Sequence, residues 1–195
     1  MSRRVGQSSR AGLDWRVVGI AAAIVVALLI VIVAVVVGGP DPHWTGQIQP
    51  DEGRQHVAVG TTVNYKSAVP TSGNHYSSVN PQCPMNWGVY SSPVIKECVV
   101  HNLEHGGIVI WYQSSLPQAQ VQQLASFVNA QLGSSQFKYI LTPWNGQDFG
   151  HPIAVTAWRY LLYLDDANLD AVRSFGSQHY EKSPEPNGGP AAPVG

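Results

Sequence analysis

The stretch Val99–Tyr112 reads V-V-H-N-L-E-H-G-G-I-V-I-W-Y, and it decides the expected fold. Its second half, Gly107–Tyr112, is a run of β-branched and aromatic residues that predicts a buried strand. After this expected strand the spacing of the apolar residues changes. Apolar residues recur at helical spacing from Leu116 to Leu132 and Gly133 follows, so we expect a helix over this range. A strand followed directly by a helix indicates a domain of mixed α and β structure.

Further elements are expected on both sides of this stretch. Strands are predicted at Phe137–Leu141 and Ile153–Leu164, and the second is apolar enough to be central in a sheet. Asp165 or Asp166 would cap a last helix, and a short strand is expected near Thr61–Tyr65. The order predicts an α+β fold: one small domain with a mixed or antiparallel sheet and two helices on one face.

The first half of the stretch carries candidate chemistry. His101, Glu104 and His105 fall within five residues, and in a helical turn the two imidazoles would share a face. Imidazole is a common ligand of zinc and copper, and a carboxylate can be a third ligand or a general base. The order H-x-x-E-H also occurs in inverted zinc proteases. Here Gly106-Gly107 end any helix and no helical Glu ligand follows, so a metal site is favoured over a protease.

The N-terminal region predicts a membrane anchor. Val17–Val37 is an unbroken apolar run of 21 residues, long enough to cross a bilayer as a helix. The run ends in A-V-V-V-G-G-P, a poor cleavage site, so we expect an uncleaved signal anchor rather than a signal peptide. Residues 1–16 carry four arginines against one aspartate and are expected to stay in the cytoplasm, which places the rest of a single-pass protein outside.

The exported part is expected to hold one domain. Residues 38–54 are predicted to be a linker, residues 55–182 the α+β domain and residues 183–195 a disordered tail rich in Pro and Gly. Residues 38–195 contain seven Lys or Arg and eleven Asp or Glu, a formal charge of −4. A mildly acidic domain without basic clusters argues against nucleic acid as a partner, and the sequence identifies no protein partner.

Two cysteines, Cys83 and Cys98, both fall in the exported part. In an oxidising compartment a pair this close is expected to form a disulfide. A redox or thiolate-ligand role is less favoured because the C-x-x-C spacing is missing.

Short blocks of sequence follow one another in a recognisable order between residues 53 and 186. They are G-R-Q-H-V (53–57), N-Y (64–65), V-P-T-S-G-N-H-Y (69–76), G-V-Y (88–90), V-H-N-L-E-H-G (100–106), T-A-W (156–158) and P-E-P (184–186). Together they resemble the bacterial domain-of-unknown-function family 3105. Val69 and Asn74 stand where the family usually has proline, and Arg159 follows the tryptophan where the family often has glycine. These departures concern turn geometry and leave the histidines in place.

The resemblance implies a residue set rather than a reaction, because the family has no settled activity. It adds His56 and His75 to the two histidines of the first motif, His101 and His105. His75 follows a Pro-Thr-Ser-Gly turn that would aim its side chain. We expect His75, His101 and His105 to lie within ligand distance of one another around zinc or copper, with His56 and Glu104 either as further ligands or next to the ligands.

Three functions remain open at this level. The first is a membrane-anchored domain that binds a transition metal through these residues. The second is a non-catalytic structural or interaction domain of the cell envelope, in which the histidines and Glu104 form a buried polar network. The third is a metal-dependent hydrolase with Glu104 as the base. No other cofactor is expected.

Overall fold

The computed structural model describes residues 15–16, 18–20, 22–26, 42–78 and 83–193. The chain forms two separate units, Met1–Gly39 and Pro40–Gly195. Described residues of the first unit are helical, but no helix among the described residues is long and apolar enough to span a membrane. Most of the predicted anchor, residues 17–37, and most of the predicted cytoplasmic segment 1–16 lie outside the described residues.

The second unit is built on a mixed six-stranded sheet of order β1-β8-β7-β5-β6-β4. Its strands are β1 (Gln47–Ile48), β4 (Gly88–Val89), β5 (Ile108–Tyr112), β6 (Tyr139–Pro143), β7 (Ile153–Ala157) and β8 (Tyr160–Leu164). Strands β4, β6 and β5 run parallel, and the pairs β5–β7, β7–β8 and β8–β1 are antiparallel. The strand expected at Gly107–Tyr112 is therefore β5, in the middle of the sheet.

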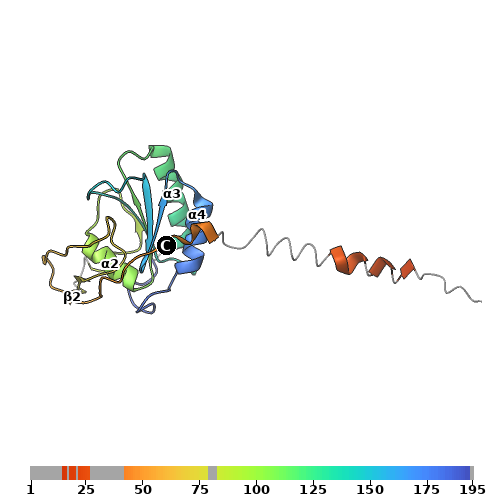
Figure 1. Cartoon of the computed structure of the whole chain (residues 1–195), viewed down its shortest axis with the longest axis horizontal. Helices are drawn as coiled ribbons and strands as arrows, with labels where there is room; N and C mark the ends of the chain where they lie inside the picture. The colour runs from red at the N-terminus through yellow and green to blue at the C-terminus, as the bar shows by residue number, and fades with distance from the viewer. Residues whose placement is uncertain (1–14, 17, 21, 27–41, 79–82, 194–195) are drawn as a thin grey trace, which may run out of the picture. The chain divides into compact units, whose positions relative to one another are not determined.

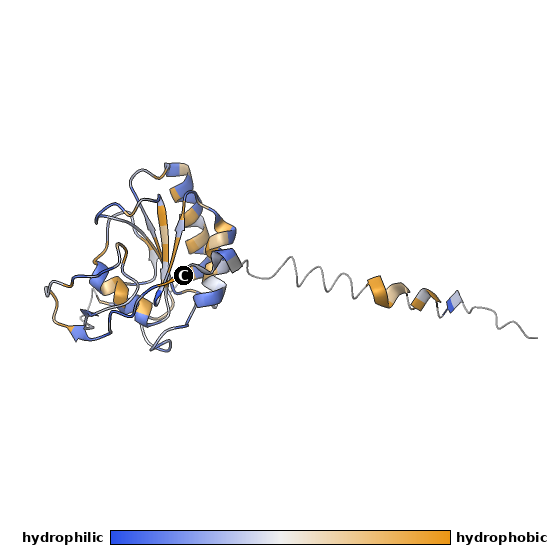
Figure 2. Ribbon diagram, in the orientation of Figure 1, coloured by the Kyte–Doolittle hydropathy of each residue, from blue (hydrophilic) through white to orange (hydrophobic). Residues whose placement is uncertain are grey.

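Helices cover both faces of this sheet (Figure 1). Helices α3 (Gln118–Leu132) and α4 (Leu169–His179) pack on one face against Ile108 and Ile110. Helix α2 (Lys96–Glu104) packs on the other face against Val109 and Trp111. Side chains alternate between the two faces along β5, so this strand contributes residues to both hydrophobic cores. The central strands are strongly hydrophobic (Figure 2). Two helices on one face were expected, and the third helix, on the opposite face, is the one that carries the histidine motif.

The predicted single strand Ile153–Leu164 is a hairpin, β7 and β8, turning at Trp158-Arg159. Nothing in this apolar run signals a turn. Arg159 has φ +63°, a left-handed conformation that glycine adopts without strain, so the position where the family often has glycine is the turn residue. The backbone N–H of Arg159 donates to the carbonyl of Thr71, which ties the hairpin to the segment that leads to His75.

The region predicted as a linker, residues 38–54, is folded from residue 42 onward. A short 3-10 helix, η1 (Pro42–Thr45), packs beside α4, and β1 adds an edge strand to β8. The carboxylate of Glu52 accepts hydrogen bonds from the backbone N–H groups of Lys66 and Ser67. No strand forms at Thr61–Tyr65, where the backbone has no regular structure.

The last segment also differs from the disordered tail predicted for residues 183–195. As far as Pro190 it lies along the domain as a strap. The indole N–H of Trp87 donates to the carbonyl of Pro190 over 2.9 Å, and the backbone N–H of Glu185 donates to the carbonyl of Glu104 over 3.1 Å. Pro and Gly remove side-chain packing but leave backbone groups, and those groups hold this strap. The last helix is capped by the side chain of Asn168 rather than by Asp165 or Asp166.

Candidate metal centre

Helix α2 presents two different faces. Val99, Val100 and Leu103 point into the core against the sheet. His101 and Glu104, three residues apart, share another side of the helix, as the helical repeat requires. Both residues are buried: counted over backbone and side chain together, His101 is 2% exposed and Glu104 is 1% exposed. The helix ends after Glu104, because Gly106 takes a left-handed φ of +81°.

A two-stranded ribbon supplies two more histidines. Strand β2 (His56–Val57) pairs in parallel with β3 (His75–Tyr76), and His56 is directly opposite His75. Residues opposite one another in a sheet point to the same face. The turn before β3 is held by the N–H of Gly73, which donates to the carbonyl of Gly53. The ribbon therefore places two imidazoles side by side against α2.

The side chains of His56, His75, His101 and Glu104 converge on one point. Each offers a ligand atom, and these four atoms all lie within 4.8 Å of one another. Oε2 of Glu104 is 3.0 Å from Nε2 of His75 and 3.6 Å from Nε2 of His56. The three rings form a triangle with centroid separations of 4.8, 4.8 and 4.9 Å. A cluster of this size can surround a single metal ion.

Backbone carbonyls fix the proton positions of the two buried rings. Nδ1 of His75 is 2.9 Å from the carbonyl of Gly73, and Nδ1 of His101 is 2.8 Å from the carbonyl of Tyr76. A carbonyl can only accept, so each Nδ1 carries a hydrogen and donates it. In a neutral ring Nε2 then has a lone pair. This arrangement, with Nδ1 bonded outward and Nε2 directed inward, is typical of metal-ligating histidines.

Burial disfavours the charged form of both rings. It lowers the pKa of His101 to about 4, chiefly because the interior disfavours the charged imidazolium. Burial likewise lowers the pKa of His75 against the opposing pull of Glu104. A neutral His75 directs the Nε2 lone pair at the carboxylate oxygen 3.0 Å away, so two acceptors face each other. A cation or an additional proton between them resolves that repulsion.

His105, an expected ligand, is not a member of the group of four. It follows the end of α2, and its Nδ1 donates to the carbonyl of Glu185 in the strap over 2.9 Å. Its ring lies 4.8 Å from that of His101 by centroids, as the four-residue spacing predicts. Gly188 packs on the His105 ring with no room for a Cβ. Its hydrogen bond and its packing thus tie His105 to the strap.

A disulfide ties the other end of α2 to the preceding segment. Cys83 and Cys98 are bonded, with their Cα atoms 4.9 Å apart. Beside them the side chain of Asn102 accepts from the N–H of Met85 and donates to its carbonyl. Cys98 precedes His101 by one helical turn, so this bridge braces the part of α2 that carries the ligands.

Two residues that support the site, Asn102 and Lys138, could not be assigned this role from the sequence. The buried ammonium of Lys138 pairs with Glu181 at 2.9 Å and donates to the carbonyls of His105 and Pro186. It therefore joins the end of α2 to the strap. A lone lysine beside a strand gives no sequence signal of such a role, whereas Asn102 lies within the motif itself.

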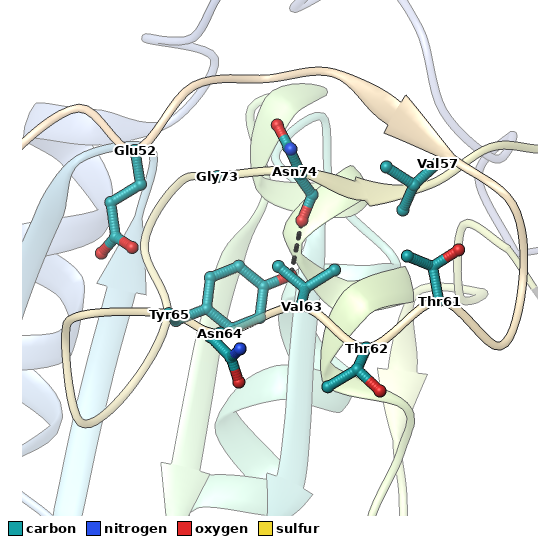
Figure 3. Close-up of a pocket in the computed structure, with 9 residues that line it drawn as sticks. All are labelled: Glu52, Val57, Thr61, Thr62, Val63, Asn64, Tyr65, Gly73 and Asn74. Carbon is teal, nitrogen blue, oxygen red and sulfur yellow. Dashed lines mark hydrogen bonds between the residues drawn. The ribbon is translucent and has the colours of Figure 1, made fainter.

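A polar pocket adjoins the ribbon (Figure 3). Its lining includes Val57, Gly73 and Asn74, which lie within two positions of His56 or His75, but it contains no histidine. Across the pocket the hydroxyl of Tyr65 donates to the carbonyl of Asn74 over 2.8 Å. This hydrogen bond holds the residue before His75, so the pocket wall supports the ligand rather than forming part of its shell.

Comparisons with known proteins agree with the resemblance seen in the sequence. Residues 56–192 match the family described as "Protein of unknown function (DUF3105)". This match includes the ribbon, α2 and the strap. No curated protein and no solved structure matches the chain. The chain belongs to the DUF3105 family.

Proposed function

We propose that this protein is a membrane-anchored, extracytoplasmic domain that binds a transition metal through Nε2 of His56, His75 and His101 and a carboxylate oxygen of Glu104. The convergence of these four atoms within 4.8 Å carries the proposal. Its second support is the hydrogen bonding of His75 and His101, whose Nδ1–H groups donate to carbonyls and leave Nε2 to the metal.

The donor set favours zinc or divalent copper. Three imidazole nitrogens and one carboxylate oxygen are borderline and hard ligands, and four donors suit the tetrahedral preference of zinc. Monovalent copper prefers thiolates and thioethers. The cysteines of the domain are joined to each other, so neither offers a thiolate.

The 3.0 Å contact between Glu104 and His75 also favours a second candidate, a structural domain with a metal-free polar network. In that case one shared proton would stabilise the pair. A hydrolase would require Glu104 to act on a bound water as base. We assign Glu104 as a ligand instead, because Oε2 lies among the imidazole nitrogens.

Elemental analysis tests the proposal directly. Residues 40–195 form a compact unit with its own cores and can be purified without a histidine tag. We expect one equivalent of zinc or copper, removable by a chelator and restored on adding the ion. The variant His75→Gln should lose it, whereas His151→Ala, which alters an exposed histidine outside the group of four, should keep it. A unit that takes up no ion under these conditions would support the polar network.

The membrane and export parts of the proposal come from the sequence. The apolar run Val17–Val37 and the arginines before it support a single-pass anchor with the metal-binding unit outside the cytoplasm. The bond between Cys83 and Cys98 supports an oxidising compartment.

A further inference from the structure

The four ligands are not equivalent in exposure. The side chains of His75 and Glu104 are 0% and 2% exposed, whereas that of His56 is 46% exposed. Nε2 of His56 is also farther from the Glu104 carboxylate, 3.6 Å against 3.0 Å for His75. One ligand therefore faces solvent while the others are enclosed.

The ligands also differ in how their rings are held. His75 and His101 each donate Nδ1–H to a backbone carbonyl. No hydrogen bond to Nδ1 of His56 is formed by any residue the structure describes. The ring of His56 makes an edge contact with His75 and a tilted contact with His101. Ring contacts alone fix an imidazole less firmly than a hydrogen bond to its second nitrogen.

The backbone that carries His56 is also held by few hydrogen bonds. Strand β2 consists of two residues, and its partner β3 is of the same length. Two backbone hydrogen bonds flank His56, from the N–H of His75 to the carbonyl of Gln55 and from the N–H of Ser77 to the carbonyl of Val57. By contrast, His101 and Glu104 belong to a nine-residue helix that is braced by a disulfide and buried against the sheet.

We propose that His56 is an exchangeable ligand: it occupies a coordination position that a monodentate nitrogen donor from outside, such as an imidazole, can take over. This inference rests on the proposed metal site and adds to it the side on which the ion enters and leaves. His75, His101 and Glu104 retain the ion, and the ion is gained and released on the side of His56. The site is then suited to passing a metal on, unlike a structural zinc site, whose four ligands are all held in place.

The test uses the unit of residues 40–195 loaded with divalent cobalt, whose visible spectrum reports its coordination. Wild type is compared with His56→Ala, His75→Ala and His75→Gln. His151→Ala serves as the matched control, because His151 is exposed to a similar degree, 40% against 46%, and lies outside the group of four. Affinity is measured by competition with a chelator, and imidazole is then added to each protein. Circular dichroism of the metal-free proteins verifies that each variant folds.

We expect His56→Ala to bind one equivalent with an affinity reduced by roughly tenfold or less, and imidazole to restore its wild-type spectrum. The His75 variants should lose more than about 100-fold, and imidazole should not rescue them, because the buried position cannot be reached. An equal loss in His56→Ala and the His75 variants would overturn the inference, as would a spectrum of His56→Ala that imidazole leaves unchanged. A wild type that binds no metal would instead refute the metal site itself, so the two failures are distinguishable.

Discussion

At the scale of single residues, Glu104 separates the metal site from a metal-free network. Its carboxylate faces Nε2 of His75 at 3.0 Å, and that ring already donates its Nδ1 hydrogen to Gly73. We predict that Glu104→Gln abolishes metal binding but changes the stability of the metal-free unit by less than about 1 kcal/mol, because the new amide donates to Nε2. Chelator competition and urea unfolding measure the two effects.

The opposite result would identify a network. If Glu104 and a protonated His75 form a buried ion pair, removing the charge of one partner should cost the metal-free protein roughly 3–5 kcal/mol. Asp165→Asn is the matched control, since it neutralises the exposed carboxylate that faces His151 and should leave both metal affinity and stability unchanged.

A second prediction at this scale concerns pH. The pKa of His101 is lowered from its ordinary 6.5 to about 4 by burial, so between these values the unfolded chain binds a proton that the folded protein does not. The contribution of His101 to the free energy of unfolding is therefore complete above about pH 6.5. It falls by about 3 kcal/mol as the pH is lowered towards 4. Bound metal should steepen the loss, because protons compete for the same lone pairs.

Urea unfolding of the metal-free unit across this window, in wild type and His101→Gln, measures the contribution. The variant should show a shallower dependence on pH. Some dependence should remain, because burial also lowers the pKa of His75 and of His179. Equal slopes in the two proteins would show that His101 does not contribute.

At the scale of elements, the disulfide bridges α2 and the segment that precedes it. Cys83 and Cys98 are separated by 15 positions, and a closed loop of this size restricts the unfolded chain by about 3 kcal/mol. We predict that the double variant Cys83→Ser and Cys98→Ser loses about this much stability in urea. Its metal affinity should also fall, because the bridge lies one turn from His101. A double variant with wild-type stability would show that the core of α2 suffices without the bridge.

The elements also show which parts of the fold could be predicted from the sequence. Helix α3 and strand β5 were predicted within one or two residues, because each carries an apolar period that local sequence determines. The turn at Trp158-Arg159 was missed, since the residue in the left-handed conformation is an arginine. The strap and the edge strand β1 were missed because backbone hydrogen bonds to distant segments hold them, and composition does not record such bonds.

The residues of the candidate site likewise divide into those that local sequence predicts and those that depend on distant segments. His101 and Glu104 could be paired from the sequence because three residues make nearly one helical turn. His56 and His75 could be grouped with them only through the family blocks, because their register in the ribbon joins segments nineteen positions apart. His105 is not in the group of four: helical spacing brings its ring near that of His101, but its Nδ1 donates to the strap, which the sequence does not predict.

At the scale of the whole molecule, the proposal that the metal site lies outside the cytoplasm depends on the N-terminal charges. Four arginines and one aspartate precede the apolar run Val17–Val37: Arg3, Arg4, Arg10, Arg16 and Asp14. We predict that a reporter fused after Gly195 is active only when it reaches the extracytoplasmic side. Replacing the four arginines by lysine should preserve this orientation, whereas replacing them by glutamate should disturb it, because lysine and arginine both count towards cytoplasmic retention.

The oxidation state of the two cysteines tests the same membrane topology independently. In the predicted orientation Cys83 and Cys98 reach an oxidising compartment, so thiol labelling of the full-length wild type and of the lysine variant should find both cysteines protected. In the glutamate variant the fraction of chains retained inside should carry free thiols and lose reporter activity together, since both follow from the side on which the domain folds. Free thiols in the wild type, or a mature chain that begins near Gly38, would contradict the anchored orientation and place the metal site in a different compartment.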